Sequence, residues 1–124
     1  MRIATIARVL SGAGLASVVT AACGGGGLPP PQTSFEQAQA DLGRAEAGGA
    51  PSVPDAKLHL QLASEDLNKS KEMVGQDNRR AESLLELSRI EAQLALSLAK
   101  AAQAQSGADQ AQQEVQKAKS GGAQ

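Results

Sequence analysis

Cys23 is the residue whose chemistry stands out, because it is the only cysteine in the 124-residue chain. It directly follows the small residues Thr20, Ala21 and Ala22, and it directly precedes four glycines. A lone thiol has no partner for a disulfide within the chain. We therefore expect Cys23 to be an attachment point for another group, with a plain free thiol as the alternative.

The residues before Cys23 have the three parts of a secretory signal. Arg2 and Arg8 make the start positive, an apolar stretch of about 11 residues follows from 9 to 19, and small residues come last. A membrane span needs roughly 20 apolar residues, so this stretch is too short to remain in the bilayer. We predict that residues 1–22 are a signal peptide.

The small residues that end at Cys23 resemble the lipobox of bacterial lipoproteins, although Thr20 stands where that family most often has leucine. The resemblance implies cleavage between Ala22 and Cys23, and attachment of lipid, including acyl chains such as palmitate, to Cys23. Two or three acyl chains hold a protein stably at a membrane. Gly24 occupies the position where aspartate marks inner-membrane retention in enteric bacteria, which implies the outer membrane, facing the periplasm. The alternative is an ordinary secreted protein that keeps a free thiol.

Other side chains give little sign of catalysis. His59 is the only histidine, and no second histidine or further cysteine is present to build a metal site with it. The glycines at 24–27 lack the preceding strand and following lysine of a phosphate-binding loop. We expect no enzyme, no catalytic residue, no metal and no cofactor. The following carboxylates are expected on solvated helix faces: Glu65, Asp66, Glu72, Glu82, Glu86 and Glu91.

Composition and charge limit what the mature chain can be. Without Arg2 and Arg8, ten Lys and Arg residues remain against thirteen Asp and Glu, a net charge of about −3. This acidity, with Phe35 as the only aromatic residue, argues against nucleic-acid binding. Glycines and three consecutive prolines make residues 23–33 a flexible tether. The remainder is rich in Ala, Gln, Glu, Leu and Lys, a composition typical of helices and coiled coils.

Three helices are expected, within an all-α fold. Thr33 and Glu36 form a capping-box pattern, so the first helix should run from about 34 to 47. The second should begin near Pro54 and end at Gly75, and the third should be capped by Asp77 or Asn78. The expected core stripe of the first helix is Phe35, Ala38, Leu42 and Ala45. That of the second is Val53, Ala56, Leu60, Ala63, Leu67, Ser70 and Val74. The third helix has the same three-and-four spacing, and its part before residue 99 is expected to face the core: Leu87, Ile90, Leu94, Ser97, Ala101, Ala104, Ala108, Ala111, Val115 and Ala118.

The short connection at Gly75 predicts that the second and third helices fold back as an antiparallel hairpin. Counting from this turn places Leu67 level with Leu85 and Leu58 level with Leu94. The first helix should pack on this hairpin, so the fold is a small helical hairpin or three-helix bundle over residues 34–99 with a long C-terminal helix. Residues 100–124 then extend past the bundle, either as a frayed tail or as a stripe that orders against a second copy or a partner protein.

Most of the mature chain resembles an alanine-rich helical domain of unknown function found in bacterial envelope lipoproteins, sometimes beside OmpA-like modules. The resemblance rests on "PDAKLHLQLASEDL", "GQDNRRAESL" and "SRIEAQLALSLAKAAQAQ". It implies an envelope location and a helical fold. We expect a lipid-anchored structural or adaptor element that contacts an envelope protein or itself through its helices; the alternative is a carrier for a small apolar ligand.

Overall fold

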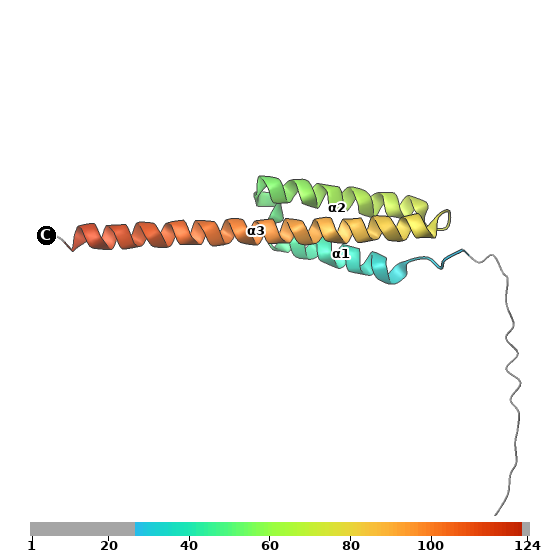
Figure 1. The fold of residues 1–124 in the computed structure, drawn as a ribbon, viewed down its shortest axis with the longest axis horizontal. Coiled ribbons are helices and arrows are strands. Elements are labelled where there is room, and N and C mark those ends of the chain that lie inside the picture. Colours follow the sequence, from blue (N-terminus) through green and yellow to red (C-terminus); the bar gives the residue numbers. More distant parts are fainter. Residues whose placement is uncertain (1–26, 123–124) are drawn as a thin grey trace, which may run out of the picture.

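The computed structural model describes residues 27–122. Its elements are α1 (Gln32–Ala47), the short 3-10 helix η1 (Ala50–Ser52), α2 (Pro54–Met73) and α3 (Asn78–Gly121), and no strand occurs among the described residues. In Figure 1, α1 and α2 lie along the first half of α3, and the second half continues alone. The predicted all-α fold, a three-helix bundle with a long C-terminal helix, is confirmed. None of these helices combines the length and apolarity needed to cross a membrane.

Helix α1 begins two residues before the predicted start. The amide of Phe35 donates to the Pro31 carbonyl at 3.0 Å, and no side chain caps the helix. The capping box expected at Thr33 is therefore wrong, because Thr33 already lies inside the first turn. The neighbouring Ser34 hydroxyl instead donates to Glu82 Oε1 of α3 at 2.6 Å, which places the start of α1 level with the start of α3.

The connections between helices follow the predicted signals. Gly49 has φ +90°, a conformation that favours glycine, and Pro54 is the first residue of α2. Gly75 has φ +83° in the turn between α2 and α3. Asp77 caps α3 by accepting a hydrogen bond from the Arg80 amide at 3.0 Å. These turns make α2 antiparallel to α3 and α1 parallel to it.

The core lies where α1 and α2 meet the first half of α3. The stripes predicted for α1 and α2 are confirmed, with Leu42, Leu60 and Leu67 as their largest buried side chains. The Ser88 hydroxyl of α3 donates to the Ala63 carbonyl of α2 at 2.7 Å, which agrees with the predicted hairpin register to within about one residue. Leu67 and Leu85 are both buried, as that register requires.

The stripe predicted to face the core from α3 is wrong. Leu87, Ile90 and Leu94 are 49%, 53% and 40% exposed, and Leu58 of α2, expected opposite Leu94, is 55% exposed. The residues of α3 that are buried are Ala81, Leu85, Ser88, Ala92, Ala95 and Ala99. This second stripe has the same three-and-four spacing but mostly small side chains, and small side chains allow two helices to approach a third closely.

Candidate interaction surface

The outward face of α3 carries apolar and small residues that the bundle leaves uncovered. We call it the outer stripe; its members are Leu87, Ile90, Leu94, Ser97, Ala101, Ala104, Ala108, Ala111, Val115 and Ala118, and all of them are exposed. Leu87 follows the buried Leu85 by two residues, or about 200° around a helix, so the outer stripe points away from α1 and α2. These are the residues that the sequence predicted to face the core, but they lie on the face of α3 opposite to the core.

Leu58 and Leu62 of α2 add apolar area beside this stripe. They are 55% and 38% exposed. The Ser88 to Ala63 hydrogen bond and the contact of His59 with Glu91 place Leu62 level with the turn of α3 that holds Leu87 and Ile90. Several large apolar side chains exposed at one level of a small protein are typical of an interaction site.

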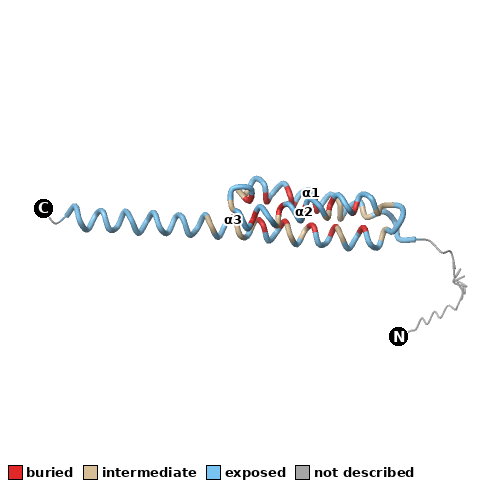
Figure 2. Tube along the Cα trace, turned by 90° about the horizontal axis from the view of Figure 1, so that it is seen from above, coloured by how far each residue is buried: buried red, intermediate tan, exposed pale blue. Residues whose placement is uncertain are grey.

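Beyond Gln103, α3 has no neighbour within the described part of the chain. The Gln103 side-chain amide donates to the Gly48 carbonyl at 3.0 Å, and this is the last contact of α3 with the α1–η1 turn. The helix continues to Gly121, and every residue from Gln103 to Gly122 is exposed, as Figure 2 shows. The protruding segment 104–121 is about 27 Å long at 1.5 Å per residue.

Asp41 is a buried charge that the sequence analysis missed. It is 3% exposed and contacts three side chains: Arg44, Arg89 and Gln93. Its Oδ2 atom accepts from Arg89 Nε at 3.3 Å and from Gln93 Nε2 at 3.1 Å. Burial raises the pKa of Asp41, but hydrogen bonds from Arg44, Gln93 and Arg89 and the charge of Arg44 outweigh it and hold the pKa below its usual 3.8. The available signal was its position between Ala38 and Ala45 on the apolar stripe, where a charge requires a partner.

His59 joins α2 to α3. Its Nδ1 atom lies 2.5 Å from Glu91 Oε2, and the two side chains are 26% and 25% exposed. The sequence suggested a fully solvated position for Glu91, but this side chain is only partly exposed because His59 contacts it. Glu65, by contrast, is exposed and lies 3.7 Å from Lys69, one helical turn away. No group of three or more His, Cys, Asp or Glu residues within 27–122 is arranged to hold a metal ion.

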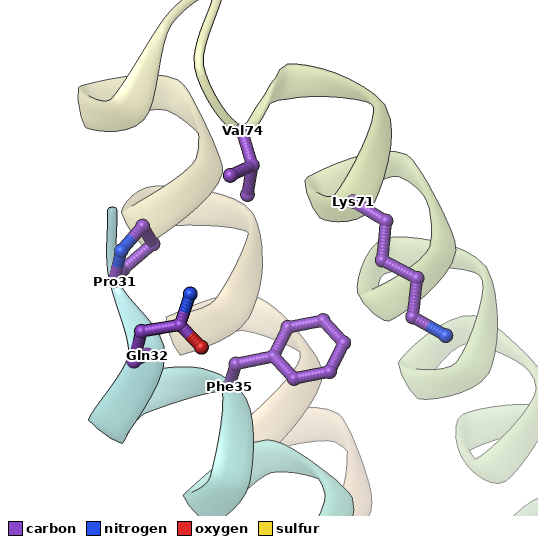
Figure 3. Close-up of a pocket in the computed structure, with 5 residues that line it drawn as sticks. All are labelled: Pro31, Gln32, Phe35, Lys71 and Val74. Atoms are coloured by element: carbon purple, nitrogen blue, oxygen red, sulfur yellow. The ribbon is translucent and has the colours of Figure 1, made fainter.

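Two small hollows lie where the chain enters α1. The first has a volume of about 220 Å³. Figure 3 shows that it lies between the start of α1 and the end of α2, and its lining residues are Pro31, Gln32, Phe35, Lys71 and Val74. Lys71 Nζ lies 5.4 Å from the centre of the Phe35 ring, a cation–π distance. The second, of about 310 Å³, is lined partly by Ser34, Asn78 and Glu82. Ligand pockets usually measure about 300–1,000 Å³, so the first hollow is smaller than that range and the second lies at its lower limit.

Residues 33–111 match the model of DUF4398, a domain of unknown function. The chain belongs to the DUF4398 family. The DUF4398 match covers the whole bundle and continues to Ala111, so it includes the first two turns of the protruding segment. No curated protein and no solved structure matches the chain significantly. Ala22 and Cys23, the predicted cleavage and lipidation residues, lie outside the described residues of this DUF4398 protein.

Proposed function

We propose that this DUF4398 protein is a lipid-anchored lipoprotein of the bacterial envelope that acts as a structural or adaptor element. The observation that carries the proposal is the outer stripe of α3, an apolar face without a partner among the described residues. It begins on the bundle at Leu87 and continues along the protruding segment to Ala118. A helix with such a face is a common means of docking against another helix.

The lipid anchor rests on the residues around Cys23. A signal of residues 1–22 delivers the chain across the inner membrane, and lipid on Cys23 then retains it at a membrane surface. Gly24 favours the outer membrane, with the bundle in the periplasm. The described chain starts close to this anchor: the Leu28 carbonyl accepts a hydrogen bond from the Asn78 side chain at the start of α3. The protruding segment extends from the opposite end of the bundle (Figure 1), so a lipid on Cys23 would leave it pointing away from the start of α1.

The anchor is tested by fractionation. Cys23→Ser should move the protein from the membrane fraction to the soluble periplasmic fraction, and only the wild type should incorporate a labelled fatty acid. Ser52→Ala, a comparably small change at an exposed residue of η1, serves as the control and should remain membrane-bound. A Cys23→Ser protein that still sediments with membranes, together with an unlabelled wild type, contradicts the lipoprotein proposal.

The interaction role is tested by photo-crosslinking in intact envelopes. A photoreactive residue at Val115, which is 53% exposed on the outer stripe, should give defined crosslinked species that mass spectrometry can identify. The same residue at Gln113, exposed on the opposite side of the protruding segment, is the matched control. Equal crosslinking from both positions, or none from either, contradicts an interaction through this face.

A further inference from the structure

The two stripes of α3 change differently where the bundle ends. The buried stripe continues past Ala102 as Ser106, Asp109, Gln113 and Gln116, so it becomes polar once α1 and α2 are gone. The outer stripe stays apolar or small for two further heptads, to Ala118. An apolar stripe that outlasts the bundle and faces away from it is not used for intramolecular packing.

We infer that the outer stripe pairs with the outer stripe of a second copy, as an antiparallel coiled coil whose two-fold axis crosses α3 near residue 106. This inference rests on the proposed interaction function and identifies its partner. In heptad terms, the first core position holds Leu87, Leu94, Ala101, Ala108 and Val115. The second holds Ile90, Ser97, Ala104, Ala111 and Ala118.

In this register each protruding segment lies along the outer stripe of the other copy from Leu94 onward, while Ile90 lies level with Gly122 of the second copy and Leu87 lies beyond the pairing. Ala104 packs against Ala108 of the second copy, Ala101 against its Ala111, and Leu94 against its Ala118. Leu94 of the bundle thus meets a small residue of the segment. At the axis only alanines meet, which allows the two helices to approach closely. The α1 and α2 helices lie on the other side of α3, so they do not obstruct the second copy.

The charges beside the stripe select this register. Glu91 faces Lys119 of the second copy, and Lys100 faces Glu114 of the second copy. Because the pairing is symmetric, each of these contacts occurs twice. All four side chains belong to residues at least partly exposed in the single chain. Lys100, Glu114 and Lys119 form no ion pair within residues 27–122, whereas Glu91 also contacts His59 through Oε2. Opposite charges at these flanking positions set the orientation of coiled coils.

A parallel arrangement fits the charges less well. It would place Glu86 of one copy beside Glu91 of the other on both flanks of the pairing, where like charges are unfavourable, and it keeps only one attractive kind of contact, between Glu114 and Lys119. Antiparallel pairing also brings Gly107 next to Gly107 of the second copy. Nothing lies within 4 Å of a Cβ built at Gly107 in the single chain, so no intramolecular contact requires glycine there.

Cysteine crosslinking of the full-length protein in its native membranes tests the register. Gln105 lies within about 3 Å, along the helix axis, of Gln105 of the second copy, whereas Val115 lies about 27 Å from its counterpart. Under mild oxidation Gln105→Cys should give at least about tenfold more covalent homodimer than Val115→Cys, since a disulfide tolerates little separation. The wild type, with Cys23 alone, controls for crosslinking at that residue.

Charge reversal provides the second measurement, in the Gln105→Cys background. Lys100→Glu should lower the dimer yield by about threefold or more, because two attractive contacts become repulsive. The double change Lys100→Glu/Glu114→Lys should restore it. Lys117→Glu is the matched control, since Lys117 points away from the pairing, and it should have little effect.

Three outcomes overturn the inference. Efficient crosslinking through Val115→Cys indicates parallel pairing. If the dimer yield of the Lys100→Glu/Glu114→Lys protein stays as low as that of Lys100→Glu, the charge argument is removed. The third is the absence of Gln105→Cys homodimer while Val115 photo-crosslinks to a different envelope protein. That result rejects self-pairing and leaves the proposed adaptor function standing. If neither the Gln105→Cys disulfide nor the Val115 photo-crosslink forms, self-pairing and the adaptor function are both rejected.

Discussion

At the scale of single residues, Asp41 links α1 to α3 through Arg89 and Gln93. Asp41→Asn keeps the shape but removes the charge, and hydrogen bonds to a charged group contribute about 1.5–3 kcal/mol. The oxygen of the asparagine amide can still accept a hydrogen bond. We therefore expect the variant to lose only roughly 1–2 kcal/mol of unfolding free energy at pH 7. Asp109→Asn, at an exposed carboxylate of the protruding segment, is the matched control.

The same carboxyl makes the effect dependent on pH. Its pKa in the folded protein is below the usual 3.8, so its stabilisation is fully present above that value. It is lost as the pH falls through the folded-state pKa. Chemical unfolding at a series of pH values should therefore show wild type and Asp41→Asn converging below about pH 3.8. If the difference in unfolding free energy between wild type and Asp41→Asn stays constant down to pH 2, the charge of Asp41 is not the source of that difference.

Gly48 is a second residue whose identity the packing requires. A Cβ at this position would lie 2.3 Å from Leu96 Cδ1 and 3.0 Å from the Arg44 carbonyl oxygen. Gly48→Ala must displace Leu96, and overpacking of this kind costs about 1–3 kcal/mol. Gly43→Ala is the control, because nothing lies within 4 Å of its Cβ inside α1. Thermal melting should show Gly48→Ala below and Gly43→Ala above the wild type.

At the scale of elements, the two stripes of α3 should respond differently to truncation of a leucine. Leu85 is fully buried, and Leu85→Ala should cost about 2–4 kcal/mol through lost packing and a cavity. Leu94 is 40% exposed, and Leu94→Ala should cost less than about 1 kcal/mol. Urea unfolding at low protein concentration, where copies do not pair, makes the comparison. Equal losses would mean that Leu94 also faces a core.

At the scale of the whole molecule, the protruding segment should be dispensable for the bundle and essential for association. Deleting residues 104–124 keeps Gln103 and its hydrogen bond to Gly48, and it removes only exposed residues from the described chain. The melting temperature at low concentration should stay within about 2 °C of the wild type, since no bundle contact is lost. Sedimentation should show loss of self-association. A truncated protein that still pairs would place the interface elsewhere.

The sequence by itself determined most of the helix ends in the bundle and which faces of two helices are buried. Pro54, the Gly48-Gly49 pair, Gly75 and Asp77 act through local backbone geometry and capping, which do not depend on distant contacts. For α1 and α2, one apolar stripe is present and it faces the core. The start of α1 was misplaced by two residues because the Thr33 cap pattern suggested a local bond that the chain does not make.

Tertiary structure alone decided which stripe of α3 is buried. Both stripes repeat every three to four residues, so their periodicity is the same, and the larger side chains of the outer stripe made it the natural choice. The choice was wrong because α3 must contact α1 and α2 together, and close approach of two helices favours the stripe of Ala81, Ala92 and Ala95. The partners of Asp41 also depend on this rotation, because it brings Arg89 and Gln93 to α1. A periodic pattern identifies a face, but only the neighbours that pack against a helix determine which of two faces is the inside.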